Sequence, residues 1–136
     1  LAERFRDSGV ETVVSPAVGG IIVGQEVGRA LGVRAIFAEK ESDDRLSFRR
    51  GFRLKPGERV LIAEDVVTRG GRVQQTIDLV RRCGADIAGV AVLVDRSDGV
   101  DFGVLFRSLL KLELTTYAPE ECPLCEAGHP LTKPGS

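Results

Sequence analysis

The chain has 136 residues, 43% of them hydrophobic, and its 19 basic and 20 acidic side chains leave a formal net charge of -1. That length suits one globular domain, and the balanced charge excludes bulk attraction to nucleic acid or anionic lipid. No apolar run approaches the ~20 residues that cross a bilayer, and an odd count of three cysteines disfavours a secreted disulfide framework. We therefore expect a cytoplasmic protein without a nucleic-acid or membrane partner.

In the first half of the chain, strand-like runs flank a helix that follows glycines. Residues 1–9 (LAERFRDSG) look like the end of an amphipathic helix, so we expect further N-terminal sequence before them. Runs at 11–16 (ETVVSP) and 33–39 (VRAIFAE) predict strands, and 18–32 (VGGIIVGQEVGRALG) predict a glycine turn and a helix. The polar stretch 41–52 (ESDDRLSFRRGF) has no sustained apolar period and predicts a loop.

The second half repeats the order of strand, glycine turn, helix and strand. Residues 60–65 (VLIAED) form an apolar run that ends in two carboxylates, which is typical of a strand buried on both faces of a parallel sheet. Helical spacing over 73–80 precedes another buried strand at 87–95 (IAGVAVLVD). Strands that alternate with helices predict a parallel α/β sheet, whose ligands bind beyond the carboxyl ends of the strands.

The C-terminal part of the chain is less regular. Residues 102–121 (FGVLFRSLLKLELTTYAPEE) predict a further strand or a short helix, whereas 122–136 (CPLCEAGHPLTKPGS) are too rich in proline and glycine for regular structure. We therefore expect a core domain over residues 1–120 and a C-terminal tail over 121–136.

The informative block is VLIAEDVVTRGGRV, in which Glu64 and Asp65 are followed by Thr68, then Gly70 and Gly71, and then a helix. Glycines let successive backbone N–H groups point inward around an anion, and a helix N-terminus adds its positive dipole end. The carboxylates repel phosphate, but they can accept hydrogen bonds from sugar hydroxyls or hold waters on magnesium. The block therefore predicts a sugar-phosphate site.

A plainer interpretation is that the two acids only end a strand and that TRGG is an ordinary turn. The full ordered set is much less frequent by chance. Neither glycine turn contains the GKS or GKT of a P-loop or the complete G-x-G-x-x-G of a dinucleotide fold, which disfavours ATP hydrolysis and NAD binding.

The block resembles the 5-phosphoribosyl-1-pyrophosphate (PRPP) signature of the type I phosphoribosyltransferases. SPAVGGIIVGQEVGRALG, GFRLKPGERVLIAEDVVTRGG, VLVDRSDG and CPLCEAGHPLTKPGS extend the resemblance, most closely to the orotate phosphoribosyltransferases, over nearly the whole chain. The resemblance implies an α/β fold with a central, mostly parallel sheet flanked by helices. It also implies a glycosyltransferase that moves the ribose 5-phosphate of PRPP to orotate, giving orotidine 5'-phosphate and pyrophosphate in pyrimidine (UMP) biosynthesis.

The same resemblance assigns the binding residues. Glu64 and Asp65 would hold the ribose hydroxyls, and the following loop would wrap the 5-phosphate. The PRPP-binding residues that it implies are Val18, Gly19, Gly20, Lys40, Glu64, Asp65, Val66, Val67, Thr68, Arg69, Gly70, Gly71 and Arg72. For orotate it implies Thr68 and Arg96, whose planar guanidinium suits the substrate carboxylate.

Lys40 and Asp65 are the catalytic residues that the resemblance implies. Lys40 matches a lysine that reaches the pyrophosphate, typically in the neighbouring subunit, so a homodimer with shared active sites is expected. Such a lysine would neutralise the leaving group as the glycosidic bond breaks. The expected cofactor is Mg²⁺, held mainly by PRPP and water and not directly by protein ligands.

The chain departs from the family pattern at the loop after Lys40. Glu39 stands where many relatives carry a basic residue, and the usual later lysine and histidine are not evident. The nearby cations are Arg45, Arg49 and Arg50. Arg69 and Arg72 replace residues that often bear hydroxyls, which we interpret as added positive charge for phosphate.

Two rival functions stay open. One is a phosphoribosyltransferase for a purine base, and the other is a non-catalytic regulator that senses PRPP. Separately, Cys122, Cys125 and His129 in the tail have the spacing C-x2-C-x3-H. That spacing could supply three zinc ligands, but a closed structural site needs four and no convincing fourth is nearby.

Overall fold

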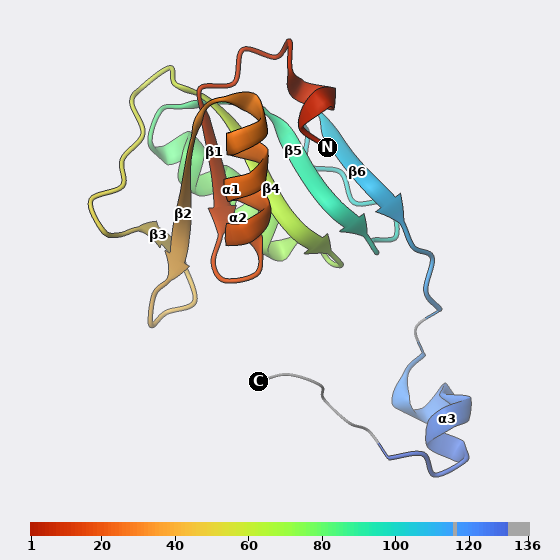
Figure 1. The fold of residues 1–136 in the computed structure, drawn as a ribbon. Helices are drawn as coiled ribbons and strands as arrows, with labels where there is room; N and C mark the ends of the chain where they lie inside the picture. The colour runs from red at the N-terminus through yellow and green to blue at the C-terminus, as the bar shows by residue number, and fades with distance from the viewer. Residues whose placement is uncertain (116, 131–136) are drawn as a thin grey trace.

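One six-stranded sheet forms the centre of the molecule (Figure 1). The computed structural model describes residues 1–115 and 117–130, and the last part of the predicted tail, 131–136, lies outside the described residues. The elements are η1 (Ala2–Phe5), β1 (Thr12–Pro16), α1 (Gly20–Leu31), β2 (Arg34–Lys40), β3 (Leu46–Phe48), β4 (Arg59–Val67), α2 (Gly71–Arg82), β5 (Asp86–Asp95), β6 (Phe106–Lys111), η2 (Pro119–Glu121) and α3 (Pro123–Glu126).

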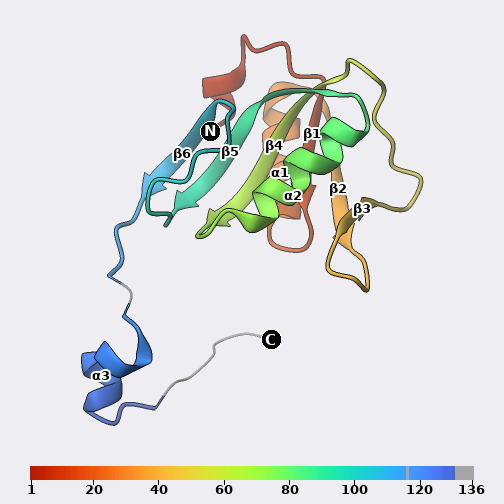
Figure 2. The same ribbon diagram turned by 180° about the vertical axis from the view of Figure 1, so that it is seen from behind.

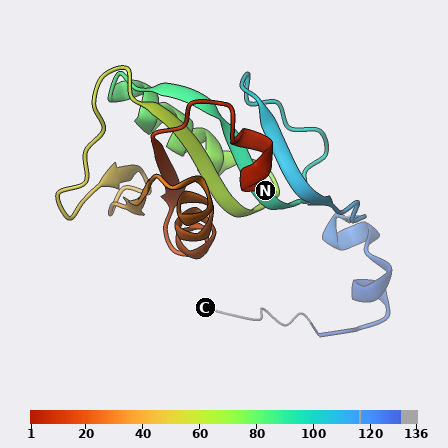
Figure 3. The ribbon, with the colours of Figure 1, turned by 45° about the horizontal axis from the view of Figure 1, so that its top comes forward.

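The sheet has the strand order β3-β2-β1-β4-β5-β6, and every neighbouring pair is parallel except β2 with β3. Helices α1 and α2 cover opposite faces of this sheet (Figures 1 and 2). Figure 3 shows α1 nearly end-on, with the sheet between the two helices. The predicted α/β class with a mostly parallel, helix-flanked sheet is therefore confirmed.

Side-chain alternation along β4 explains why both faces are buried. Val60 and Ile62 pack on the α2 side with Ile77, whereas Leu61 packs on the α1 side with Val27. All three β4 side chains are fully buried, and burial of each stabilises the fold by roughly 1.5–3 kcal/mol. A continuous apolar run is the expected sequence of such a strand.

Three element predictions need correction. The predicted loop 41–52 contains β3, because Leu46 is 3% exposed and packs with Ala38 and Leu79 while β3 pairs with β2. Strand β4 continues to Val67 instead of ending at the two carboxylates. The tail also has regular structure, since proline begins the short helices η2 and α3, where its missing N–H costs nothing.

Within the described residues, none of the helices has the length and apolar character that crossing a membrane requires.

The sheet reverses its winding between β1 and β4. Strand β1 has β2 on one side and β4 on the other, and the helices that follow β1 and β4 lie on opposite faces. The loops at the carboxyl ends of these two strands therefore lead to helices on opposite faces of the sheet. In open α/β sheets this switch point is where ligands bind.

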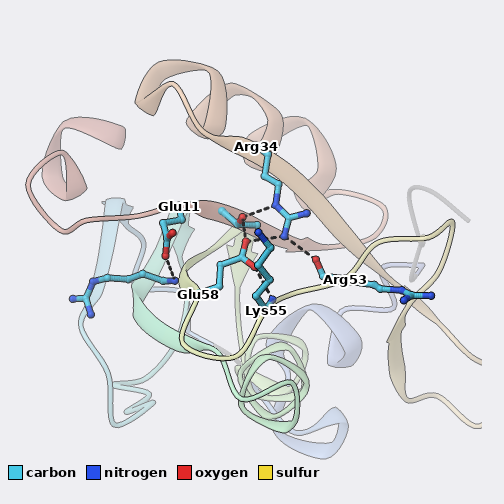
Figure 4. Close-up of polar contacts among 7 residues, drawn as sticks. Glu11, Arg34, Arg53, Lys55 and Glu58 are labelled. Carbon is cyan, nitrogen blue, oxygen red and sulfur yellow. Dashed lines mark hydrogen bonds and ion pairs between the residues drawn. The ribbon is translucent and has the colours of Figure 1, made fainter.

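At the opposite end of the sheet, where β1, β2 and β4 begin, a buried carboxylate connects the strands (Figure 4). Glu58, 8% exposed, accepts hydrogen bonds from the Thr12 hydroxyl, from Arg34 Nη2 at 2.7 Å and from the Lys55 backbone N at 2.7 Å. Burial raises the pKa of Glu58, but these hydrogen bonds outweigh it and leave the pKa below its ordinary value. This network therefore links β1, β2 and the turn before β4.

Replacing this carboxylate should lower the stability of the fold. We expect Glu58→Gln to reduce the free energy of unfolding by about 2 kcal/mol, because an amide cannot accept all three hydrogen bonds and its NH₂ faces donors. The exposed Glu11, which accepts a hydrogen bond from the Arg59 backbone N, provides the control. Urea denaturation should give Glu11→Gln a loss below ~1 kcal/mol, and equal losses for the two variants would refute the network's role.

Candidate active site

A cavity of about 310 Å³ lies where β4 passes into α2. Its lining residues are Asp44, Val66, Val67, Thr68, Arg69, Gly70, Gly71, Arg72, Val73 and Gln75. The whole predicted phosphate loop, 66–72, is among them. The first turn of α2 has no acidic residue and no side chain that caps it. Its backbone N–H groups are therefore left for an anion, which the helix dipole also favours.

The two glycine-containing loops approach each other through the predicted carboxylates. A Cβ built on Gly19 would overlap the Asp65 carboxylate, and one built on Gly20 would lie 2.9 Å from Glu64 Oε1. A side chain at either glycine would therefore displace one of the two acidic side chains or the loop after β1. The structure thus brings Gly19 and Gly20 to the two acids at the switch point, as the predicted single site requires.

Glu64 and Asp65 differ in environment. Glu64 is 7% exposed, and burial, aided by the hydrogen bond to Asp65 and its charge, raises the pKa of Glu64 to about 8. Asp65 is half-buried, and its Oδ1 accepts from the Val66 backbone N at 2.7 Å. At neutral pH Glu64 therefore keeps its proton, so the pair offers both a donor and acceptors to hydroxyl groups.

Asp44, which no sequence motif singled out, lies at the cavity between two of the predicted PRPP-binding cations. Asp44 pairs with Lys40 at the end of β2, and its Oδ1 lies 2.9 Å from Arg72 Nη2. Hydrogen bonds from Lys40 and then Arg72 hold the pKa of Asp44 below its ordinary value. Both cations were predicted to bind PRPP, so Asp44 stands where a substrate anion would be expected.

The predicted base-binding residues follow neighbouring strands. Thr68 comes directly after β4 and Arg96 directly after β5, and both side chains are exposed. The Arg96 backbone N donates to the Val67 carbonyl at 2.7 Å, which ties the start of the Arg96 loop to the phosphate loop. In the loop after β1, Val18 is 80% exposed.

The possible zinc ligands in the tail do not form a metal site. Over the described residues, no group of three or more His, Cys, Asp or Glu side chains is placed to hold a metal ion. Cys122 and Cys125 lie in η2–α3 beyond the end of β6 and far from the sheet (Figure 1), so they take no part in the cavity.

Residues 1–103 match the family described as phosphoribosyl transferase domain. The fold is similar to the crystal structure of adenine phosphoribosyltransferase from Thermoanaerobacter pseudethanolicus, with a TM-score of 0.72 over 82% of this chain and 76% of that chain. The sequence identity to that structure is 20%, so the likeness concerns the fold alone. The chain belongs to the phosphoribosyltransferase family.

More similar relatives narrow the assignment. The chain is 56% identical to orotate phosphoribosyltransferase of Caldanaerobacter subterraneus subsp. tengcongensis, over 100% of this chain and 72% of the relative. It is 54% identical to that of Pelotomaculum thermopropionicum, again over 72% of the relative, and 52% identical to that of Thermotoga maritima, over 73%. Within the family the chain groups with the orotate phosphoribosyltransferases. The resemblance noted in the sequence is confirmed, and the purine-base alternative is not favoured.

Proposed function

We propose that this chain transfers the 5-phosphoribosyl group of PRPP to orotate, giving orotidine 5'-phosphate and pyrophosphate, with PRPP bound in the cavity after β4. The observation that carries the proposal is the cavity itself, because it collects residues 66–72 beside the acid pair at the switch point of the sheet. The identity of 50–56% to orotate phosphoribosyltransferases supports orotate as the acceptor.

Different groups of the site bind different parts of PRPP. Backbone N–H groups of the loop at Gly70 and Gly71 bind the 5-phosphate, and Glu64 and Asp65 bind the ribose hydroxyls. The loop at Gly19 and Gly20 leaves room for the pyrophosphate. Orotate nitrogen attacks the ribose C1 as pyrophosphate leaves, so the protein acts mainly by orienting the reactants and neutralising the leaving group.

Magnesium fits this set of residues as a cofactor bound through the substrate. The Asp65 carboxylate supplies the hard oxygen acceptors that the waters of Mg²⁺ prefer, and the ion keeps several waters in such sites. Glu64, which is protonated in the ligand-free protein, is left for a ribose hydroxyl. When bound, Mg²⁺ supplies charge neutralisation of the pyrophosphate oxygens. Asp65 would orient a bound water or a ribose hydroxyl through its carboxylate.

We also propose a cytoplasmic homodimer in which Lys40 of one subunit serves the neighbouring active site, with residues 1–120 as the core domain and 121–136 as the tail. Mixing two inactive variants tests the shared sites. If Lys40→Gln and Asp65→Asn subunits exchange, mixed dimers carry one intact site, and about a quarter of wild-type activity should return. If subunits exchange but no activity returns, Lys40 acts in the active site of its own subunit.

The reaction is tested by pyrophosphate release with PRPP, magnesium and, in separate tubes, orotate, uracil, adenine, guanine and xanthine. We expect turnover with orotate alone. We expect Arg96→Gln to raise the KM for orotate at least tenfold, since a charge-assisted bidentate contact is lost, and to leave the KM for PRPP unchanged. Turnover with a purine would overturn the acceptor, and tight PRPP binding without turnover would favour a regulator.

Asp44 should compete with PRPP for Lys40 and Arg72. We expect Asp44→Asn to lower the KM for PRPP two- to fivefold, because exposed ion pairs contribute up to about 1 kcal/mol and the cations no longer have to be released. Asp43, which pairs with Arg45, gives the matched control, and Asp43→Asn should leave that KM unchanged. A raised KM in Asp44→Asn would mean that Asp44 orders the site instead of competing for it.

A further inference from the structure

Three neighbouring strands end in one row at the carboxyl edge of the sheet. Strand β4 ends at Val67, β5 at Asp95 and β6 at Lys111, and the register pairs Val67 with Asp95 and Asp95 with Lys111. The arrowheads of these strands point to the same edge in Figure 1. This row connects the predicted phosphate loop, the residue before Arg96 and the edge strand.

A buried carboxylate occupies the middle of the row. Asp95 is 5% exposed, and its Oδ1 accepts hydrogen bonds from the Ser97 backbone N at 2.8 Å and from Ser97 Oγ at 2.6 Å. Its Oδ2 lies 3.1 Å from Lys111 Nζ. The same ammonium group donates to the Ser97 carbonyl at 2.9 Å. Lys111 therefore binds the Asp95 side chain and the Ser97 carbonyl, which belong to the residues on either side of Arg96.

These contacts fix the backbone on either side of Arg96. Its own N donates to the Val67 carbonyl at 2.7 Å, and the Asp95 carbonyl accepts from the Leu112 backbone N at 2.8 Å. Asp95 and Ser97 are buried, whereas Arg96 between them is exposed. The turn thus holds the Arg96 backbone rigidly and presents its side chain to solvent at the edge where the substrate binds.

The Asp95 carboxylate is held in place by these contacts. The ammonium of Lys111 and the two Ser97 donors together satisfy the Asp95 oxygens. Without Lys111, Asp95 Oδ2 and the Ser97 carbonyl would lose their shared donor, and the turn that carries Arg96 would be held less firmly.

We propose that Lys111 is a positioning residue for orotate, which acts by holding Asp95 and Ser97 so that the Arg96 guanidinium is directed at the substrate carboxylate. The inference rests on the proposed function, in which Arg96 binds orotate. It concerns Lys111 on β6, which no glycine turn or acidic motif marks in the sequence.

The first test compares steady-state kinetics of the full-length protein with those of Lys111→Met. We expect the KM for orotate to rise about tenfold, while kcat and the KM for PRPP stay within about twofold. Lys111→Arg, which can donate to the same two acceptors, should restore the KM for orotate. Arg107 lies exposed on the same strand and donates to the Phe106 carbonyl. Arg107→Met therefore controls for lost charge on β6 and should change neither KM.

A double-mutant cycle separates positioning from a structural role. In an Arg96→Gln background, Lys111→Met should have no further effect on the KM for orotate, because its action passes through Arg96. If Lys111→Met lowers kcat and stability and raises both KM values together, Lys111 only stabilises the edge of the sheet. That result would overturn the inference. Should Lys111→Met fail to fold, Ser97→Ala decides the matter, with an expected three- to fivefold rise in the KM for orotate alone.

The two proposals fail in different ways. If Arg96→Gln leaves the KM for orotate unchanged, the assignment of Arg96 is wrong and the inference falls with it. If Arg96→Gln raises that KM but Lys111→Met does not, the proposed function stands and Lys111 has no positioning role.

Discussion

Gly70→Ala is expected to destabilise the fold by about 2–5 kcal/mol and to remove most of the activity. The backbone at Gly70 has φ +77°, where an L side chain costs about 1–2 kcal/mol. An added Cβ would lie 2.9 Å from Phe102 Cε1 and 2.9 Å from Val100 Cγ2. Phe102 is buried in the core, so this contact adds an overpacking cost of roughly 1–3 kcal/mol.

The neighbouring glycine should behave differently, which makes Gly71→Ala the matched control. A Cβ at Gly71 would meet nothing within 4 Å, and Gly71 begins α2, where alanine is favoured by up to about 1 kcal/mol. Gly71 nevertheless lines the cavity, so its new methyl group would occupy space that the phosphate needs. We expect unchanged or raised stability with at least a tenfold higher KM for PRPP.

Urea denaturation and steady-state kinetics on the two variants check both expectations. A stable Gly70→Ala would show that the loop can rearrange around Phe102, which would remove the structural requirement for glycine there. If Gly71→Ala leaves the KM for PRPP unchanged, the phosphate does not bind at the N-terminus of α2.

The sequence could predict the parts of the fold that depend on local pattern. The apolar run through Leu61 and Ile62 indicated a strand buried on both faces, and the acids and glycines after it indicated the edge where a site forms. Strand β3 could not be predicted, because the burial of Leu46 depends on packing against Ala38 of β2 and against Leu79 of α2, which is 33 residues away along the chain. Three residues are too short a stretch to display a period.

The same reason explains which site residues were missed. Asp44 bears no motif, and its importance comes from lying between Lys40 and Arg72 after the chain has folded. Lys111 and Asp95 are 16 residues apart and meet only because β5 and β6 end in register. Local sequence can indicate that a carboxylate ends a strand, but not which cation will neutralise it.

Glu64 should make the stability of the ligand-free protein fall as pH rises. Its pKa is raised from 4.5 in the reference state to about 8 by burial and by Asp65. Below the lower value both the folded and unfolded states bind the proton, so Glu64 contributes no pH dependence there. Between the two values the unfolded state loses the proton first, so the free energy of unfolding falls by at most about 1.4 kcal/mol per pH unit.

The whole window could cost at most about 5 kcal/mol, and the loss is complete above the folded-state pKa. Glu64→Gln should remove this fall, because an amide of the same shape has no proton to lose. Urea denaturation at about pH 5 and about pH 8 measures the difference. Asp65→Asn is the control, since it removes the neighbouring charge and should shift the window to lower pH without abolishing it. If Glu64→Gln retains the wild-type slope, another group is responsible and Glu64 is ionised in the folded protein, so it could not donate a hydrogen bond to the ribose at neutral pH.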